Sequence, residues 1–487
     1  MVFCLCLAVP LVALSSQSLW IDEALTAAKA QQPTLAAWWR LLVEEKLSDV
    51  QMPLYMLWVW AFAKVFGSGE WVLRAAGLPW FYAGLVAWLT LRPSSRRSRM
   101  ATGLVAGLCP FAWSYLDEAR PYAMQLGASL LIGAALLRLL GRERASAGRE
   151  RFWLWAFGAG LVVLSGSSLI GMIWAGAALA VAAVVCPRER RVEWLRTHWA
   201  LALGVAAALA GFGGYFLWTL HLGARASAVA GTDWRSFVFV WYELLGFGGL
   251  GPGRLEIREA GLAAFKAHLP LLGCYGVIVA VVLAAGAARL WETSERKAVV
   301  SAGACCVLAA FFLFCAGWVA HFRVLGRHFT PMVPVLLLLL SVGLTSLWSR
   351  RRLLARTITA AFCVLALCSC LSLRFTERHQ RDDYRSAAAV AKAALAAHQT
   401  VWWNADAHGA AYYGLPMARD ERAPGKALAL GNPSAEQLAG LPVPDWIIVS
   451  KPDLYDAAGA LAGYLERNGF VQERTLPAFR VWQRRSR

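Results

Sequence analysis

The stretch HLPLLGCYGVIVAVVLAAGAAR, residues 268–289, contains no acidic residue and carries its single arginine at its end. A helix needs about 20 apolar residues to cross the hydrocarbon core of a bilayer, so this stretch is long enough to span a membrane. The whole chain of 487 residues is 59% hydrophobic and only 16% charged, which is too little charge for the surface of a soluble protein of this size. The sequence therefore predicts a polytopic α-helical membrane protein.

Similar apolar runs recur along the chain and predict about eleven transmembrane helices. The first run lacks a basic n-region and a convincing cleavage site, which favours an uncleaved helix over a signal peptide. The predicted spans are 2–19, 70–91, 101–116, 119–140, 153–167, 170–186, 199–219, 268–289, 298–318, 331–348 and 357–373.

Arginine and lysine residues mark one side of the predicted membrane domain. Short loops rich in these residues stay in the cytoplasm, so their positions set the orientation. With eleven spans, five basic loops fall on the same side, and the net charge of +18 is mainly this topology signal. No basic patch with interleaved aromatic residues accompanies them, so nucleic acid is not an expected partner. The basic residues of the five loops are Arg92, Arg96, Arg97 and Arg99; Arg142, Arg144, Arg149 and Arg151; Arg188, Arg190, Arg191 and Arg196; Arg296 and Lys297; and Arg350, Arg351, Arg352 and Arg356.

The C-terminal part of the chain has the pattern of a small α/β domain. A helical pattern in DYRSAAAVAKAALAAH is followed by strand-like TVWWNA and DWIIVS, a helical YDAAGALAGYLERNG and a last strand-like FRVWQRR. We therefore predict a transmembrane domain at 1–375 and an external soluble α/β domain at 376–487. External loops are expected near 20–69 and 220–267.

The first external loop contains two amphipathic pieces, PTLAAWWRLLVEE and PLYMLWVWAFAKVFG. Such segments favour helices that lie along the membrane interface. The second piece could instead be a short span, but an additional span would reverse the side of every later loop and break the arginine pattern.

Two Asp-Glu-Ala tripeptides follow apolar runs, in SLWIDEALTAA (residues 18–28) and YLDEARPYA (residues 115–123). In the predicted topology both emerge on the external face. Four carboxylates that converge at one membrane surface repel each other and need a cation, a metal ion or an acceptor hydroxyl nearby. One interpretation is solvated acids at helix ends, and the other is a functional site at the lipid boundary. The four carboxylates belong to Asp22, Glu23, Asp117 and Glu118.

Arginine residues on the same face form a second candidate group. Arg120 follows Asp117 by three residues, so the two could form a structural pair, or Arg120 could reach an anionic headgroup. Arg74 opens a predicted span, where the alternative is a side chain that snorkels to the surface. Carboxylates opposite arginines favour a reaction with an acid–base pole and a phosphate pole. The turn HFRVLGRHFTP adds Arg323, Arg327 and His328.

The order of these motifs resembles family 39 of the polytopic glycosyltransferases of the GT-C class. This family includes protein O-mannosyltransferases and the aminoarabinose transferase of lipid A. The resemblance covers nearly the whole chain. Its motifs, in family order, are LWIDEA, QMPLYMLWVWAFAKVFGSGEWVLRAAG, YLDEARPYAM, GRHFTPMVPVLLLLL and DYRSAAAVAKAAL.

The resemblance implies transfer of a sugar from a polyprenyl-phosphate donor to a lipid, glycan or protein acceptor outside the cytoplasm. It makes Asp22 the expected catalytic base with Glu23 beside it, and its motifs add Tyr55 and Tyr122 to the expected donor- or acceptor-binding residues. The expected location is the inner membrane of a bacterial-type cell, with multiple crossings and an extracytoplasmic active site. The resemblance fixes no cofactor and leaves a divalent metal ion as an open expectation.

The chemistry of such a donor agrees with these residues. A departing phosphate monoester is a good leaving group, because its second pKa is about 6. It needs cations near the phosphate more than it needs a general acid, whereas a hydroxyl acceptor needs a base. A single direct displacement would invert the anomeric configuration.

The chain departs from the family at two places. It has Gln51-Met52-Pro53 where relatives often have His-Pro-Pro, and LSGSSLIGM where relatives often have an aromatic-flanked histidine. Both departures suggest a different acceptor from that of the best-known members.

Two other functions remain open. A transporter or flippase of lipid-linked sugars would need charged residues at mid-membrane and paired broken helices. A non-catalytic envelope scaffold would use the external domain to bind a partner.

Overall fold

The computed structural model describes residues 2–91, 95–140, 146–222, 231–293, 296–350, 352–419 and 423–485. Contacts divide the chain into two compact units. The first comprises Met1–Ser15, Thr34–Gly67 and Trp71–His379, and the second comprises Ser16–Pro33, Ser68–Glu70 and Gln380–Arg487.

The first unit is helical throughout its described residues. Its α-helices are α1 (Val2–Ala13), α3 (Leu35–Glu44), α4 (Pro53–Phe66), α5 (Glu70–Ala75), α6 (Leu78–Leu89), α7 (Arg96–Gly107), α8 (Pro110–Leu116), α9 (Tyr122–Leu140), α10 (Ala147–Ser167), α11 (Leu169–Val185), α12 (Arg188–Thr197), α13 (Trp199–Leu222), α14 (Trp234–Leu244), α15 (Arg254–Ala260), α16 (Leu269–Trp291), α17 (Arg296–Val319), α18 (Val333–Ser349) and α19 (Leu353–Phe375). Short 3₁₀ turns are η1 (Ser48–Gln51), η2 (Gly261–His268), η3 (Gly326–Met332) and η4 (Glu377–His379).

The helices confirm a multi-pass membrane protein. Among the described residues, seven helical segments are long and apolar enough to cross a membrane, or eight if α11 and α12, which meet at a bend of 119°, form one span. Eight of the eleven predicted spans coincide with these segments. The amphipathic α4 is a shorter apolar helix, as the sequence pattern indicates.

The other three predicted spans fall on segments that do not reach the same length and apolarity. In the predicted span 2–19, α1 ends at Ala13, and 101–116 is broken between α7 and α8. Pro110 begins α8 and has no N–H to continue α7. The span 153–167 lies within α10, whose first turns contain charged residues. Of the predicted cytoplasmic arginines, Arg92, Arg142, Arg144 and Arg351 lie outside the described residues.

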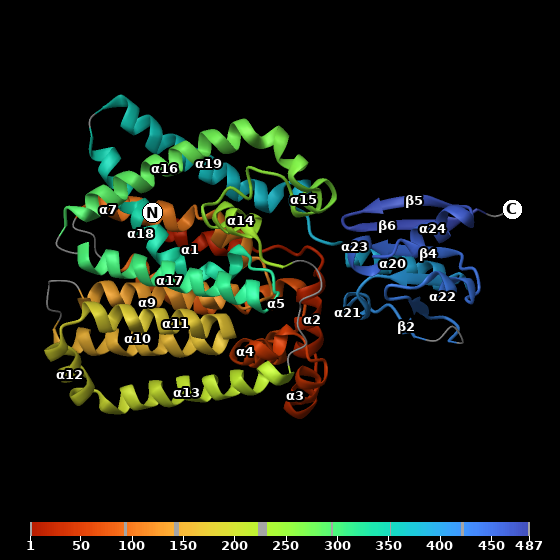
Figure 1. Cartoon of the computed structure of the whole chain (residues 1–487), viewed down its shortest axis with the longest axis horizontal. Helices are drawn as coiled ribbons and strands as arrows, with labels where there is room; N and C mark the ends of the chain where they lie inside the picture. Colours follow the sequence, from red (N-terminus) through yellow and green to blue (C-terminus); the bar gives the residue numbers. More distant parts are fainter. Residues whose placement is uncertain are drawn as a thin grey trace. The chain divides into compact units, whose positions relative to one another are not determined.

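Glycines allow two pairs of helices to pack with their backbones in contact. A Cβ atom on Gly84 of α6 would lie 2.0 Å from the carbonyl oxygen of Gly127 on α9. Gly286 of α16 and Gly343 of α18 form a similar close contact. Small residues at such crossings are typical of helix packing in membranes. Figure 1 shows α9, α10 and α11 side by side, and each is in contact with the next.

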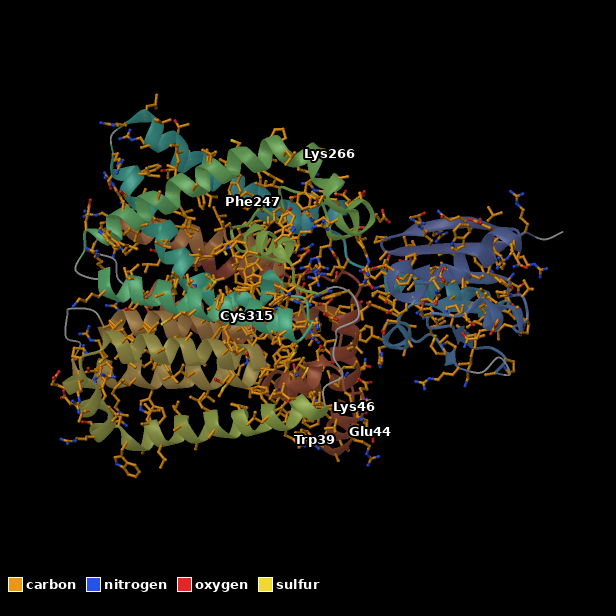
Figure 2. The ribbon with its side chains drawn as sticks, in the orientation of Figure 1. Trp39, Glu44, Lys46, Phe247, Lys266 and Cys315 are labelled. Atoms are coloured by element: carbon orange, nitrogen blue, oxygen red, sulfur yellow. The ribbon has the colours of Figure 1, made fainter. Side chains whose placement is uncertain are left out.

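The amphipathic α3 begins at an N-cap in which the Thr34 hydroxyl accepts a hydrogen bond from the N–H of Ala37. On this helix, Trp39 stacks on Trp218 of α13, with ring centroids 6.0 Å apart and planes at 11°. Figure 2 labels Trp39 together with Glu44 and Lys46, which lie close to it in the view. This pattern of aromatic and charged residues is typical of a helix at a membrane interface.

The second unit contains a six-stranded sheet. Strand order is β2-β3-β1-β4-β6-β5, with β2, β3, β1 and β4 parallel and β6 and β5 antiparallel to their neighbours. Trp402 and Trp403 of β1 point to opposite faces, where they join two separate apolar cores. The elements are α2 (Ile21–Ala30), α20 (Tyr384–Ala396), β1 (Val401–Asn404), α21 (Ala407–Tyr412), β2 (Met417–Ala418), β3 (Ala427–Ala429), α22 (Ala435–Ala439), β4 (Trp446–Ser450), α23 (Pro452–Tyr455), α24 (Ala460–Arg467), β5 (Phe470–Leu476) and β6 (Phe479–Arg484).

The predicted fold class is confirmed in both parts. The helix and strand patterns expected in the C-terminal region correspond to α20, β1, β4, α24 and β6. The short strands β2 and β3 and the strand β5 were not expected from the sequence, because their residues lack a clear alternating pattern.

Candidate functional site

The turn Asp117–Arg120 carries most of the buried charge in the helical unit. It follows α8 and precedes Pro121, and α9 begins at Tyr122. All three charged side chains of this turn are buried. Burying an unpaired ion is very costly, so each charge requires a partner. In the structure, each of these three side chains has a different partner.

Asp117 binds Arg74 and Ser15, which follows the end of α1. Its Oδ1 accepts a hydrogen bond from the N–H of Ser15 at 2.5 Å, and its Oδ2 accepts one from the Ser15 hydroxyl at 2.8 Å. Arg74 Nε lies 3.8 Å from Asp117 Oδ1, and Arg74 Nη1 donates to the carbonyl of Ser15 at 3.0 Å. Arg74 is therefore part of a buried ion pair and does not snorkel to the surface.

Glu118 binds a residue that the sequence did not single out. Its Oε1 accepts a hydrogen bond from Nη1 of Arg254, at 3.1 Å, and the Arg254 Nη2 lies 3.8 Å from Oε1 of Glu243. Tyr115 donates a hydrogen bond to the same Glu243 oxygen at 3.0 Å. We call Tyr115, Glu118, Glu243 and Arg254 the Arg254 cluster. Both carboxylates are more deeply buried than Arg254, whose side chain is 52% exposed.

Glu243 connects this cluster to the η3 turn. Its Oε2 accepts a hydrogen bond from the N–H of Gly326 at 2.9 Å. Burial raises the pKa of the Glu243 carboxyl above its ordinary value, while the nearby Arg254 charge and the Tyr115 hydrogen bond act in the opposite direction. Glu243 is thus an acid whose protonation is easier than usual in a site that contains arginines.

Arg327, on the η3 turn, reaches the same region of the unit. Its guanidinium carbon lies 5.6 Å from the ring centroid of Tyr122, a cation–π distance. The Tyr122 ring packs edge-on against Tyr115 of the Arg254 cluster, with centroids 5.2 Å apart. The structure therefore brings together three predicted residues, Glu118, Tyr122 and Arg327.

Arg120 pairs with Asp49 of η1, and both side chains are buried. Asp49 is thus one partner of Arg120, while Asp117 binds Ser15. Tyr55 is fully buried on α4. The sequence did not indicate the role of Asp49, which lies in the polar segment LSDVQ of the first loop.

The remaining residues of the predicted external turn have other positions. His328 accepts a hydrogen bond at Nδ1 from the N–H of Leu325, at 3.2 Å, and so caps the η3 turn. Its carbonyl accepts a hydrogen bond from Trp174 Nε1 at 2.8 Å. Arg323 is exposed. His328 thus has a local structural role in shaping the segment that presents Arg327.

Asp22 and Glu23 lie on α2 and belong to the second unit. Glu23 is fully buried, and its Oε2 accepts a hydrogen bond from the N–H of Trp20 at 3.3 Å and lies 3.4 Å from Arg381 Nη1. Asp22 is only partly buried. The two neighbouring carboxylates are therefore different: Glu23 stabilises the helix start, and Asp22 is the more accessible one.

The sequence missed Glu243 and Arg254, which join in the cluster. Glu243 is a single acid within the apolar stretch FVFVWYELLGF, and an isolated charge in an apolar run is a signal for a buried pair. Arg254 follows the turn GPG at the start of α15. Both residues lie in the predicted external loop near 220–267. This loop has no regular apolar pattern from which an orientation toward Glu118 could be predicted.

The sequence does not decide whether the protein binds a metal ion. The described residues contain no group of side chains that could serve as its ligands. Within those residues, no three His, Cys, Asp or Glu side chains gather in a way that could hold a metal ion. Asp117 and Glu118 bind separate partners, Ser15 with Arg74 and Arg254, respectively.

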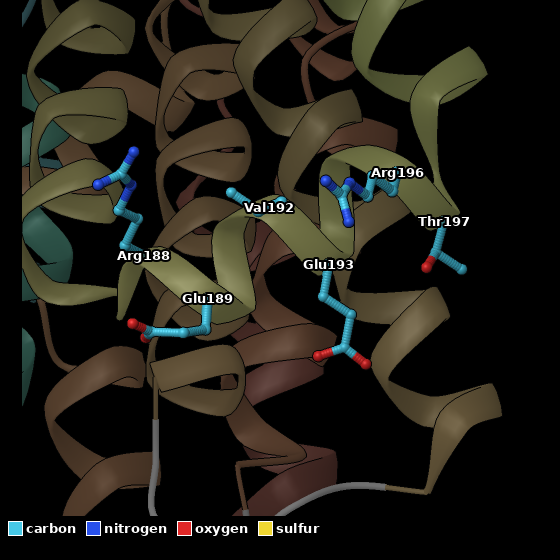
Figure 3. A pocket seen from close by; sticks show the side chains of 6 residues that line it. All are labelled: Arg188, Glu189, Val192, Glu193, Arg196 and Thr197. Atoms are coloured by element: carbon cyan, nitrogen blue, oxygen red, sulfur yellow. The ribbon is translucent and has the colours of Figure 1, made fainter.

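A pocket at another place on the helical unit is lined by α12 alone. Figure 3 shows its six residues, which are two arginines, two glutamates, a valine and a threonine. None of them belongs to the Arg254 cluster. The lining residues are Arg188, Glu189, Val192, Glu193, Arg196 and Thr197.

Comparison with known proteins agrees with the fold. The structure is similar to the crystal structure of ArnT from Cupriavidus metallidurans in the apo state, with 15% sequence identity, 99% of this chain and 96% of that chain covered, and a TM-score of 0.54. It is also similar to ArnT from the same organism bound to undecaprenyl phosphate, with 15% identity, coverage of 99% and 97%, and a TM-score of 0.51. The chain has an ArnT-like fold. No protein-family model and no curated protein matches the chain.

Proposed function

We propose that this protein is a GT-C glycosyltransferase, of the family 39 kind, that transfers a sugar from a polyprenyl-phosphate donor to a hydroxyl acceptor. The observation that carries the proposal is the Arg254 cluster. In it, a half-exposed arginine is held by the buried carboxylate of Glu118 and the partly buried carboxylate of Glu243, and a second arginine stacks on Tyr122. The ArnT-like fold supports the proposal, because ArnT has been crystallised with undecaprenyl phosphate.

The two arginines suit the departing phosphate. A guanidinium has five N–H donors in a planar fork, so Arg254 has the capacity to contact a phosphate as well as Glu118. Arg327 would add a second positive charge as negative charge develops on the leaving group. Preorganised cations of this kind stabilise the transition state because they need no rearrangement during the reaction.

Asp22 is the proposed general base. A base must be accessible to the acceptor hydroxyl, and Asp22 is more accessible than Glu23, which caps α2 and lies beside Arg381. Asp22 would remove the hydroxyl proton as the acceptor oxygen attacks the anomeric carbon. The carbon–phosphate oxygen bond would break in the same step, with inversion at the anomeric carbon. We propose that this reaction takes place on the extracytoplasmic face of the inner membrane, with a lipid, glycan or protein as acceptor.

The test is sugar transfer by the purified protein in nanodiscs, with a panel of radiolabelled polyprenyl-phosphate sugars and extracts of envelope acceptors. We expect the wild type to transfer the label. Arg254→Ala should lose this activity, and Arg254→Lys should retain part of it. Arg289→Ala is the matched control, because Arg289 is exposed on α16 and pairs locally with Glu292. Absence of transfer from every donor by folded wild-type protein would refute the proposal.

A further inference from the structure

The helix that carries the first Asp-Glu-Ala motif is built into the second unit. The segment Ser16–Pro33, which contains α2, belongs to the same unit as the C-terminal sheet. Within this unit, α2 packs against α21, the helix that directly follows β1. In open α/β sheets, ligands bind at the carboxyl ends of the parallel strands where the strand order reverses, and β1 and β4 are such a pair. In this protein, α2 packs on the helix that leaves the carboxyl end of β1.

An apolar side chain fixes the start of α2. Ile21, the first residue of the helix, packs against the core cluster that contains Tyr384 and Trp403. Both aromatic side chains are fully buried. A residue that packs into a core has a defined position, because protein interiors are close-packed. Asp22 is the next residue after Ile21.

A buried ion pair holds the first turn of α2. Glu23 is fully buried and lies 3.4 Å from Arg381, the residue that precedes the loop into α20. The same carboxylate accepts a hydrogen bond from the N–H of Trp20. Because one carboxylate binds both the helix start and Arg381, rotation of α2 about its axis would break the ion pair.

A hydrogen-bond chain holds the segment before α2. The Tyr413 hydroxyl accepts a hydrogen bond from the N–H of Leu19 at 2.8 Å and donates one to Glu70 at 2.9 Å. Burial raises the pKa of Tyr413 to about 12, so the hydroxyl keeps its proton at neutral pH. Arg385 binds the same Glu70 carboxylate at 2.5 Å and the carbonyl of Ser16 at 2.6 Å.

We infer that the C-terminal α/β domain is a positioning device for Asp22, in which Arg381, Tyr413 and Arg385 hold α2 in one orientation. This inference rests on the proposed function for the role of Asp22, but the docking itself does not. Arg381 and Tyr413 are positioning residues: they contact the helix and its leading segment, whereas Asp22 would contact the acceptor hydroxyl. The domain then contributes to turnover without binding donor or acceptor.

Two measurements on the full-length protein test the inference. The first is amide hydrogen exchange of residues 19–30 in Arg381→Gln and Tyr413→Phe. Arg381→Gln removes the ion pair to α2, and Tyr413→Phe removes the hydrogen bond to Leu19 just before the helix, so exchange should be about 10- to 100-fold faster in this segment. Arg467→Gln is the matched control, since Arg467 is an exposed arginine on α24 of the same unit. Unchanged exchange of residues 19–30 in both variants would overturn the docking.

The second measurement is the kinetics of transfer. Arg381→Gln should lower kcat while the KM for the donor stays unchanged, and Arg381→Lys should restore part of kcat. In an Asp22→Asn background, Arg381→Gln should have no further effect on kcat, because the side chain that it positions is already absent. Equal effects of Arg381→Gln in both backgrounds would show a general loss of structure and overturn the positioning role. Failure of the wild type to transfer any sugar, with the exchange result as expected, would contradict the proposed function and leave the docking established.

Discussion

Glu243 accepts a hydrogen bond from the backbone N–H of Gly326, and this bond joins α14 to the turn that presents Arg327. The same carboxylate lies beside Arg254 and the Tyr115 hydroxyl. One buried acid thus connects both arginines of the proposed phosphate site. A change in its protonation would alter the electrostatics at both.

The first prediction concerns pH. Burial raises the pKa of Glu243, and the ionised carboxylate opposes an anionic ligand. The affinity for undecaprenyl phosphate in nanodiscs should therefore increase as the pH falls through this raised pKa, by at most about tenfold per pH unit for one linked proton. The Glu243→Gln variant should lose this contribution.

The phosphate also titrates, with a second pKa of about 6, so the comparison of the two pH profiles is the decisive measurement. Thermal unfolding provides the control for folding. Because the folded-state pKa of Glu243 is raised, its contribution to stability is present below its ordinary pKa and is lost as the pH rises through the raised one. Identical slopes of affinity against pH in wild type and Glu243→Gln would contradict the prediction.

The second prediction concerns Arg327. Arg327→Ala should weaken donor binding or turnover by about 10- to 100-fold, since hydrogen bonds to a charged group are worth about 1.5–3 kcal/mol. Lysine should rescue little, because it lacks the planar fork that binds two phosphate oxygens and that stacks on Tyr122. Transfer rates measured over a range of donor concentrations test this. Arg289→Ala is a suitable control, because Arg289 is exposed and pairs locally with Glu292. Unchanged kinetics in Arg327→Ala would remove it from the site.

The third prediction concerns the base. Asp22→Asn keeps the size of the side chain but cannot take a proton, so turnover should fall by about 10²–10⁴-fold, the usual contribution of general-base catalysis. Donor binding should persist. Single-turnover transfer at matched expression is the measurement, and Glu23→Gln is the comparison.

Glu23→Gln should lose less turnover than Asp22→Asn but more stability, because Glu23 pairs with Arg381 and caps α2. Near-wild-type turnover by Asp22→Asn would assign the base to another carboxylate and refute the mechanism proposed here.

The fourth prediction concerns helix packing. Gly84→Ala would place a Cβ atom 2.0 Å from the carbonyl oxygen of Gly127, so α6 and α9 must separate. Such overpacking typically costs about 1–3 kcal/mol, which thermal unfolding in detergent should detect. Gly176→Ala on α11 is the matched control, because a Cβ there meets no atom within 4 Å. Equal unfolding temperatures for the two variants would show that the close contact is absent.

The fifth prediction concerns topology. Cysteine labelling or reporter fusions at Ser146 and Ser434 should report opposite sides of the membrane. Ser146 lies in a predicted cytoplasmic loop, and Ser434 lies in the C-terminal domain, which the arginine pattern places outside. Labelling of both positions from the same side would overturn the orientation.

The sequence predicted the helical membrane unit and the C-terminal α/β elements because both depend on local patterns. Apolar runs such as 268–289 and alternating segments such as DWIIVS are visible without knowledge of contacts. Its selection of Glu118 and Arg327 as site residues remains a prediction. It did not identify Glu243 or Arg254, because their relevance comes from contacts with Tyr115 and Glu118, which lie more than a hundred residues earlier in the chain.

The packing of α2 within the C-terminal unit could not be predicted from the sequence either. In the sequence, Ile21 is an apolar residue that follows a predicted span. Only the fold shows that it packs with Tyr384 and Trp403. The span count differed for a related reason. Apolarity alone does not show that a helix breaks at Pro110 or that α1 ends at Ala13.

The ion pair between Arg74 and Asp117 has a consequence for biogenesis. Arg74 emerges from the ribosome before α7 and α8 have been made, whereas its partner follows them. During synthesis, therefore, the arginine must be hydrated at the membrane surface or held by the insertion machinery until Asp117 arrives. The backbone contact of α6 with α9 also has to wait for the later helix. Early release of the nascent chain into lipid would expose both an unpaired charge and an unpacked glycine face, so substitutions that delay the pairing of these helices should lower the yield of inserted protein.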